Sequence, residues 1–417
     1  MEKNNFTRRL TAFFLVFCIL SASLSFGTYA EIQQIEIVKV YGVPKSITVD
    51  RAKGQSYSLP KRMTCRDADD KTYTLEVTWE NEEYRSYLEG TFEFTAVLKD
   101  KDYKFADSCL PKVTITNHIN GDFDASVSRK YYFDHENDFL DFDCYYTEND
   151  YTGTDAVYPV RLAEKNIAEY WNITNSVALY THNRSLNTGW NGLARASNVS
   201  TVLLRDFKLY NFRLELDYTH GSDWWYPYVL FGVQNPTQFF GKLNIGSAGN
   251  RETGENTDLV FDESTIPGGV YAYVEQEGNI NLYGAVDDDG YGRLYFDNDI
   301  SVDKNVLSNY NRNVKHHMSI TITNGEFALK IDDSDLFCGN IDDGAIGGLI
   351  GFGACTSDIT FDNFQITALD ENGEEIALKT AEQGFAPEFS EDNYTGWNAS
   401  RCPLEYIWGN GFDQSKW

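Results

Sequence analysis

Residues 316–333, HHMSITITNGEFALKIDD, decide the fold, because their apolar residues recur at every second position on both sides of a turn. Met318, Ile320 and Ile322 face one way on a strand, and Asn324-Gly325 turns the chain so that Phe327, Leu329 and Ile331 return on the same face. Residues 347–367, GGLIGFGACTSDITFDNFQIT, add a second pair of strands after a Gly-Gly break. The stretch therefore predicts a β-hairpin with one buried face inside a β-sandwich.

Apolar runs that precede the hairpin predict further strands at 202–204, 211–218, 228–233, 269–274 and 280–285. Only residues 163–170 hint at a helix. We therefore expect one large all-β domain over residues 131–370, a two-sheet sandwich of a dozen or so strands.

A smaller all-β unit is expected before it, over residues 31–117, with a linker at 118–130. Its turn signals recur about every ten residues, as in a small sandwich. The segments Val43-Pro44, Leu59-Pro60, Val77-Thr78-Trp79 and Gly90-Thr91-Phe92 resemble the bacterial immunoglobulin-like domains of cell-surface and polysaccharide-degrading proteins. The resemblance implies a spacer, with Trp79 in its core.

The larger domain carries a resemblance of its own. The ordered segments FRLELDY (212–218), VLFGV (229–233), GGVYAYV (268–274), the hairpin and FDNFQIT (361–367) resemble the concanavalin A-like lectin/glucanase superfamily, which includes laminin G-like sandwiches. The similarity is greatest to modules attached to bacterial glycoside hydrolases such as exo-fructanases. It implies a jelly-roll sandwich and favours a fructan as the first ligand to test.

The N-terminus predicts export. Residues 1–30 combine basic residues, an apolar run from Leu10 to about Leu24 and small or polar residues up to Ala30, which is typical of a cleaved secretory signal peptide. An uncleaved anchor is the alternative. Cleavage removes three basic residues and one acidic residue, which changes the net charge of −28 to −30. Such an acidic protein is not expected to bind nucleic acid or, after signal cleavage, a membrane.

Six cysteines remain after cleavage, and none lies in a C-x-x-C motif. Disulfides or buried thiols are therefore both compatible with an exported protein. A Cys65–Cys109 bridge is the first expectation, and Cys338–Cys355 is a weaker one. The Trp- and Gly-rich tail, residues 371–417, either packs on the sandwich or begins a further domain.

The best catalytic candidate is the pair Glu215 and Asp217, since alternation along a strand points both carboxylates to one face. Retaining glycoside hydrolases of the superfamily carry an E-x-D-x-x-E strand, but His220 occupies the third acidic position of this chain. An acid and a nucleophile therefore cannot both be assigned, and a polar outer face is the main interpretation. The sequence contains no G-x-S-x-G motif that would indicate a serine nucleophile.

The predicted binding site is a loop between two strands that combines flat aromatic rings with a carboxylate, as sugar recognition requires. The alternative is that at least one of its tryptophans caps the core. With the loop we group residues from nearby segments, so the predicted ligand-binding set is Asp223, Trp224, Trp225, Tyr226, Glu252, Tyr271, Tyr273 and Tyr283. Further loop candidates are Asn183, Arg184, Trp190 and Arg251.

Three aspartate runs offer oxygen ligands for a structural calcium ion, although none matches an EF-hand loop and solvated turns are the alternative. The runs are 287–289, 332–335 and the group Asp297, Asp299 and Asp303. No other cofactor is expected, and the sequence leaves the oligomeric state open.

Taken together, the sequence predicts a secreted or cell-surface protein with a small immunoglobulin-like sandwich and a larger concanavalin A-like sandwich. The larger domain is expected to bind a neutral polysaccharide or oligosaccharide without cleaving it. A glycoside hydrolase with an atypical active site is the first alternative, and an adhesion or structural protein with a protein partner is the second.

Overall fold

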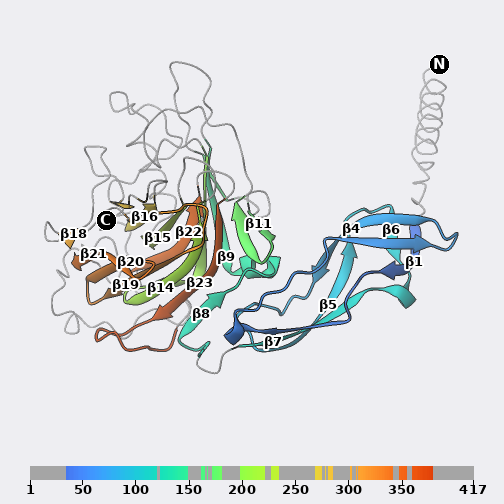
Figure 1. Ribbon diagram of the computed structural model, residues 1–417, viewed down its shortest axis with the longest axis horizontal. Coiled ribbons are helices and arrows are strands. Elements are labelled where there is room, and N and C mark those ends of the chain that lie inside the picture. The colour runs from blue at the N-terminus through green and yellow to red at the C-terminus, as the bar shows by residue number, and fades with distance from the viewer. Residues whose placement is uncertain are drawn as a thin grey trace, which may run out of the picture. The chain divides into compact units, whose positions relative to one another are not determined.

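The computed structural model describes residues 34–119, 123–148, 161–164, 167, 171–180, 198–220, 227–233, 268–274, 278, 280–284, 301–302, 307, 309–340, 347–354 and 359–378. The described residues are almost all in strands and turns, so the expected all-β fold is confirmed (Figure 1). By its internal contacts the chain divides into two units. The first comprises 1–45, 60–80 and 94–113, and the second comprises 46–59, 81–93 and 114–417.

The first unit contains five neighbouring strands of a seven-stranded sheet, in the order β5-β4-β3-β1-β6. These are β1 (Ile35–Tyr41), β3 (Arg62–Asp67), β4 (Thr72–Glu80), residues 94–98 of β5 (Gly90–Leu98) and β6 (Tyr103–Phe105). Trp79 is buried and donates its indole N–H to the carbonyl of Pro60 at 2.9 Å, which confirms its core position. A short 3-10 turn (Asp107–Cys109) precedes β7 (Lys112–His118).

The structure does not form the expected disulfide in this unit, because Cys65 and Cys109 are both free thiols. The Cys65 thiol faces the carbonyl of Met63 at 3.7 Å, and the Cys109 thiol faces that of Ile37 at 2.7 Å. Burial raises the pKa of Cys65 to about 11. Each sulfur therefore points to a backbone carbonyl. Cys338 is likewise a thiol and not half of a disulfide, and Cys355 lies outside the described residues.

The second unit contains two large sheets. One has seven strands in the order β10-β9-β13-β22-β15-β16-β17. These are β9 (Phe142–Glu148), β10 (Arg161–Glu164), β13 (Asn198–Leu209), β15 (Pro227–Val233), β16 (Gly268–Val274), β17 (Ile280–Gly284) and β22 (Gly348–Ala354). The helix expected over 163–170 is wrong for its first two residues, because Ala163 and Glu164 pair with β9 as part of β10.

The other sheet has nine strands in the order β11-β12-β23-β14-β19-β20-β21-β18, with β8 paired to β23 (Figure 1). These are β8 (Ser128–Tyr131), β11 (Trp171–Thr174), β12 (Val177–Tyr180), β14 (Phe212–Thr219), β18 (Ser301–Val302), β19 (His316–Thr323), β20 (Glu326–Ile331), β21 (Ser334–Asn340) and β23 (Thr360–Ala368). The unit also contains β2 (Ser46–Asp50), which pairs in parallel with the Thr114–His118 part of β7.

The hairpin forms as its sequence predicts. Met318 pairs with Ile331 and Ile320 with Leu329, and all four side chains are buried. The turn residues Asn324 and Gly325 both adopt positive φ, of 49° and 80°, which a two-residue hairpin turn of this type requires.

The two sheets share one apolar core, so they form a β-sandwich. Phe352 on β22 lies among aromatic rings of the opposite sheet, with ring centroids 4.7 Å from Phe361, 5.3 Å from Phe364 and 5.4 Å from Trp171. The flanking Gly353 is required by close packing, because a Cβ there would lie 2.3 Å from the Tyr228 hydroxyl. Gly348 and Gly351 of the same strand face backbone atoms of Gly232 and Val202 instead, so these two glycines allow the neighbouring strands to approach closely.

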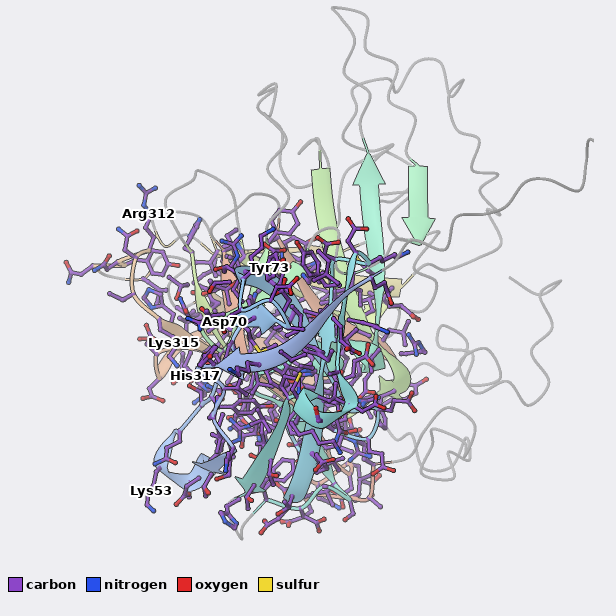
Figure 2. All side chains as sticks on the ribbon, turned by 90° about the vertical axis from the view of Figure 1, so that its right-hand side faces the viewer. Lys53, Asp70, Tyr73, Arg312, Lys315 and His317 are labelled. Carbon is purple, nitrogen blue, oxygen red and sulfur yellow. The ribbon has the colours of Figure 1, made fainter. Side chains whose placement is uncertain are left out.

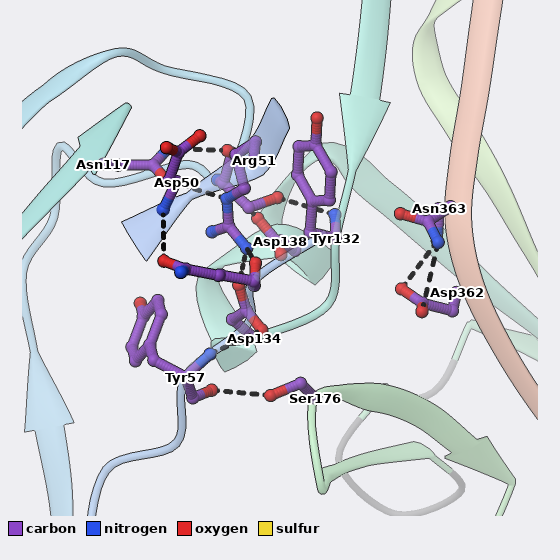
Figure 3. Close-up of polar contacts among 12 residues, drawn as sticks. Asp50, Arg51, Tyr57, Asn117, Tyr132, Asp134, Asp138, Ser176, Asp362 and Asn363 are labelled. Carbon is purple, nitrogen blue, oxygen red and sulfur yellow. Dashed lines mark hydrogen bonds and ion pairs between the residues drawn. The ribbon is translucent and has the colours of Figure 1, made fainter. Parts of the chain in front are cut away.

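Polar side chains are also buried in the second unit, in a group that we call the Arg51 network (Figure 3). Arg51 belongs to a 3-10 turn (Arg51–Lys53), and its guanidinium forms an ion pair with Asp134 while Nε donates to Asn117 Oδ1 at 2.7 Å. A second 3-10 segment (Glu136–Asp141) brings in Asp138, whose Oδ1 accepts the Ser86 backbone N–H at 2.8 Å. The network therefore ties segments 51–57, 86 and 117 to residues 134–138.

Loss of the Arg51 side chain is expected to destabilise the second unit strongly. Arg51→Met leaves the Asp134 carboxylate buried without its cation, so the free energy of unfolding should fall by about 3–5 kcal/mol. Urea unfolding followed by the fluorescence of the buried Trp171 measures the change.

The matched control is Lys330→Met, which breaks an exposed pair between Lys330 and Asp335 at 2.8 Å. An exposed ion pair is screened by water and contributes little to stability, so the control should remain close to the parent. Equal effects of the two substitutions would contradict the structural role of the Arg51 network.

Asp138 makes the stability of this unit depend on pH. Burial raises its pKa to about 7, against the opposing hydrogen bonds from Ser86, and its Oδ2 atom is buried without a hydrogen-bond partner. The folded state therefore retains a proton that the unfolded state loses near pH 4. The free energy of unfolding should fall as pH rises from about 4 to about 7.

Asp138→Asn mimics the protonated carboxyl and should remove most of this fall. Urea unfolding of both proteins at pH 5 and pH 8 measures it. An unchanged pH dependence in the Asp138→Asn protein would show that another group is responsible.

Candidate functional site

A polar cluster lies on the outer face of the nine-stranded sheet, where β14, β19 and β23 are neighbours. Along β14 the buried residues Leu214 and Leu216 alternate with the outward Glu215 and Asp217, as strand geometry requires. The expectation that both carboxylates share one face is therefore confirmed. We call the group on this face the Asp217 cluster: Glu215, Asp217, Lys315, His317, Asp362 and Asn363.

Asp217 is the centre of this cluster because it pairs with both neighbouring strands, lying opposite His317 on β19 and Asp362 on β23. Its Oδ1 atom is 2.8 Å from His317 Nδ1, and its Oδ2 atom accepts from Asn363 Nδ2 at 2.7 Å. Lys315 Nζ lies 3.2 Å from the same Oδ2 atom. Lys315 and His317 lie close to each other in Figure 2. Three donors from two segments, residues 315–317 and Asn363 of β23, thus surround one carboxylate.

These donors keep Asp217 ionised. Burial alone raises its pKa, but the hydrogen bonds from His317 and Asn363 and the charge of Lys315 lower it to about 2. The same contacts act on the histidine: its hydrogen bond to Asp217 and the nearby Glu215 carboxylate raise the pKa of His317 to about 9. His317 and Asp217 therefore form a charged pair at neutral pH.

A β-bulge aims Asn363 at Asp217. The register between β14 and β23 shifts between Glu215 and Asp217, and Asn363 adopts φ of 50° at that point. A bulge inserts one extra residue and redirects its side chain, and asparagine tolerates this conformation better than most residues. The amide consequently reaches both Asp217 at 2.7 Å and Asp362 at 3.2 Å.

The negative charge of Glu215 is also compensated by nearby cationic side chains. Its carboxylate is 3.7 Å from His317 Nε2 and 3.4 Å from Arg213 Nε. The nearby His317 ring lowers its pKa, against the effect of burial, and the charge of Arg213 adds to the lowering. Both carboxylates of the Glu215-x-Asp217 pair are therefore held in the ionised form.

Asp362 behaves differently from its neighbours. Burial raises its pKa to about 6, and the Lys315 ammonium, 3.6 Å away, only partly offsets the effect. Its side chain is 17% exposed, close to the 15% of Asp217. Two adjacent carboxyl groups thus have pKa values that differ widely, which is the arrangement that acid–base chemistry uses.

The third position of the glycosidase pattern is not part of the cluster. His220 is fully buried, its backbone N–H donates to the carbonyl of Arg312 at 3.1 Å, and its ring Nδ1 is 3.5 Å from the Tyr310 hydroxyl. Neither Glu215 nor Asp217 has the raised pKa that a general acid needs. The E-x-D pair therefore lacks the proton donor of the superfamily pattern.

Most of the predicted ligand-binding set lies outside the described residues. This holds for Asp223, Trp224, Trp225, Tyr226 and Glu252, and for the further loop candidates Asn183, Arg184, Trp190 and Arg251. Only the backbone is described for the remaining three, and it places Tyr271 on β16 opposite Tyr283 on β17, with Tyr273 next to Tyr228 of β15. These three tyrosines belong to the seven-stranded sheet, whereas Glu215 and Asp217 belong to the other one.

The calcium candidates Asp297, Asp299 and Asp303, and the 287–289 run, also lie outside the described residues. Of the third run, Asp332 and Asp333 adopt positive φ in the turn after β20, and Asp332 Oδ2 is 2.6 Å from His316 Nδ1. Among the residues that the structure describes, no three His, Cys, Asp or Glu side chains come together as a metal site would require.

Sequence analysis missed Asp362, Asn363 and Lys315. One signal was available for the bulge: Phe361 and Phe364 are both buried although they are three residues apart, which breaks the two-residue period of a strand. The pairing of Asp362 with a residue so distant in sequence has no comparable signal.

Comparisons with known proteins support part of this organisation. Residues 44–101 match the family of bacterial Ig-like domains (group 4), so the expected immunoglobulin-like segment is confirmed over that range. No curated protein matches the chain. No helix among the described residues is long and apolar enough to cross a membrane.

Similar solved structures include a Bacillus subtilis protein of unknown function with a galectin-like fold, at 10% identity, 57% coverage of this chain, 94% coverage of that chain and a TM-score of 0.35. The catalytic domain of LamA from Zobellia galactanivorans is 9% identical, with 58% and 98% coverage and a TM-score of 0.32. A carbohydrate-binding module from Bacillus subtilis is 11% identical, with 44% and 94% coverage and a TM-score of 0.27. Because these TM-scores lie below 0.5, we draw no conclusion from the likeness.

The charged pair of His317 and Asp217 can be tested directly. In an NMR titration the His317 ring should titrate near pH 9, and Asp217→Asn should lower this midpoint toward the usual value of about 6.5. Glu215→Gln is the matched control: because Glu215 is more distant from the ring, the midpoint should fall less.

If the parent ring titrated near its ordinary value, the geometry of the Asp217 cluster would be wrong. The raised pKa of His317 also determines the pH range in which its pair with Asp217 stabilises the fold. Its contribution to stability is present below the unfolded histidine pKa and is lost as pH rises through about 9.

Proposed function

We propose that this chain is an exported protein that binds a neutral glycan on the outer face of its nine-stranded sheet without cleaving it. The observation that carries the proposal is the compensation of charge around Asp217. Carboxylate, amide, imidazolium and ammonium groups lie together on one face of the sheet. Such mixed donors and acceptors suit the hydroxyl groups of a sugar.

The balance of charge favours a neutral ligand. Lys315 and His317 are each within reach of carboxylates that already compensate them, so an anion gains little from approaching either cation. A cation would meet the same two positive groups at the surface, since Lys315 is 56% and His317 47% exposed. A hydroxyl-rich ligand avoids both penalties.

The absence of cleavage is proposed because Glu215 and Asp217 are both held ionised, which leaves the E-x-D pair without an acid. A glycoside hydrolase of unusual layout is the second candidate, and Asp362 is the observation that favours it. Its raised pKa beside the ionised Asp217 gives one protonated and one charged carboxyl group. Release of reducing ends from a polysaccharide panel distinguishes the two functions.

The tryptophan loop, residues 223–226, is a second proposed location for the glycan, together with Glu252, Tyr271, Tyr273 and Tyr283. This second proposal rests on the residue types in the sequence, and the loop begins six residues after Asp217. Fructan is the first ligand to test, from the family resemblance alone. Export rests on the N-terminal signal-like segment.

A glycan array on the full chain without residues 1–30 tests the proposed function. We expect at least one neutral glycan to bind, with no release of reducing ends, and Asp217→Ala to weaken binding at least about tenfold through loss of a charge-assisted hydrogen-bond acceptor. Thr321→Ala, on the same sheet face but outside the Asp217 cluster, is the control and should bind as the parent does.

Other outcomes of these experiments would favour one of the alternative sites or functions. Loss of binding in Trp225→Ala but not in Asp217→Ala would move the site to the tryptophan loop. Reducing-end release that Asp362→Asn abolishes would establish the hydrolase instead. An array without a hit would contradict sugar binding and favour an adhesion or structural role with a protein partner.

A further inference from the structure

The Asp217 cluster supplies hydrogen-bonding groups but no flat apolar surface, which sugar sites also need. Tyr132 lies at the edge of this cluster. We infer that Tyr132 is the aromatic residue against which a ring of the bound glycan packs, while hydroxyls of that ring meet Asp362 and Asn363. This inference rests on the proposed glycan-binding function and names the stacking residue of that site.

The position of Tyr132 follows from strand pairing. Tyr131, the last residue of β8, lies opposite Phe364 of β23 and is fully buried in the core. The next residue in an extended chain points to the opposite face, and Tyr132 is accordingly half-buried on the outer side, beside the bulge at Asn363. Figure 3 shows the Tyr132 ring between Arg51 and the Asp362–Asn363 pair.

Electrostatics agree with this closeness. Burial raises the pKa of the Tyr132 hydroxyl, Arg51 opposes the rise, and Asp362 contributes to it. The Asp362 contribution, which follows that of Asp134, agrees with the strand pairing that sets Tyr131 opposite Phe364 and so brings Tyr132 toward Asn363.

The ring is held from behind by a rigid support. The Arg51 guanidinium carbon is 4.4 Å from the ring centroid, and the Arg51 network fixes that guanidinium through Asp134 and Asn117. The Tyr132 backbone N–H donates to Ser86 Oγ at 2.9 Å. A platform that is already fixed loses little conformational entropy when a ligand binds.

A second cation contacts the same ring. Lys130 Nζ is 5.3 Å from the centroid, and its side chain is half-buried on the outer face. A lysine side chain is long and flexible, and a cation–π contact of this kind contributes little at a solvated site. A sugar ring can therefore displace Lys130, whereas the buried and ion-paired Arg51 stays in place.

The aromatic face of Tyr132 and the polar groups of the Asp217 cluster together define the chemical class of the ligand. A pyranose or furanose ring presents an apolar C–H face to Tyr132 and hydroxyls at its edge to the Asp217 cluster. The Tyr132 hydroxyl is not needed for this packing, because the aromatic face supplies it.

The test uses the full chain without residues 1–30 and immobilised neutral oligosaccharides of fructan, β-glucan, xylan and mannan. For the probes that bind the parent, Tyr132→Ala should weaken binding about tenfold or more, and Tyr132→Phe should remain within about twofold. Tyr41→Ala removes an exposed tyrosine of the first unit and should leave binding unchanged.

Tyr132→Leu keeps an apolar side chain over Arg51 but removes the flat ring, so it separates stacking from folding and should also weaken binding. A measurement without substitution supports it: in protein with labelled tyrosines, the Tyr132 ring signal, assigned by its loss in Tyr132→Phe, should shift when a binding oligosaccharide is added.

The outcomes separate the inference from the function beneath it. A parent that binds a probe, with a folded Tyr132→Ala or Tyr132→Leu protein that binds equally well, overturns the role of Tyr132 and leaves glycan binding intact. An unshifted Tyr132 signal at saturation overturns the role in the same way. A parent that binds none of these probes and no array glycan overturns the proposed function itself, and the inference with it.

Discussion

The packing of aromatic side chains between the two sheets of the second unit is the interaction on which the rest of this structure depends. Phe352 of one sheet is surrounded by Phe361, Phe364 and Trp171 of the other. Burial of such rings contributes most of the stabilising free energy of a sandwich. It also fixes the register, because a shift by one residue would turn every core ring to solvent.

That constraint places the polar residues. Once Leu214 and Leu216 face the core, Glu215 and Asp217 must face outward, and pairing then sets Asp217 between β19 and β23. The bulge at Asn363 is the one departure from regular pairing at this point, and it supplies a neutral donor to Asp217. The outer face is therefore a consequence of the core pattern together with one extra residue.

The buried polar residues impose a second constraint. Arg51 and Asn117 come from the first part of the sequence and are hydrogen-bonded to each other. The ion pair of Arg51 with Asp134 connects them to the sandwich, and segments 46–59 and 114–118 accordingly belong to the same unit as the sandwich. A boundary drawn along the chain near residue 117 cannot represent this arrangement. The immunoglobulin-like match at 44–101 likewise covers residues of both units.

Sequence patterns predicted the hairpin and most strands of the sandwich, because period-two alternation is a local property that each strand carries in its own residues. They also placed Glu215 and Asp217 on one face. They did not predict that Lys315 and Asp362 approach Asp217, since this depends on which strands become neighbours. Tyr132 was missed for the same reason, as its surroundings come from Arg51 and β23.

The central claim is that the outer face of the nine-stranded sheet, between Tyr132 and Asp217, is a glycan-binding surface. A crystal structure of the chain with a bound neutral oligosaccharide tests it most directly. We expect a sugar ring stacked on Tyr132 with hydroxyls hydrogen-bonded to Asp362 or Asn363. A sugar bound instead over β16 and β17 of the seven-stranded sheet, with the Asp217 cluster unoccupied, would contradict it.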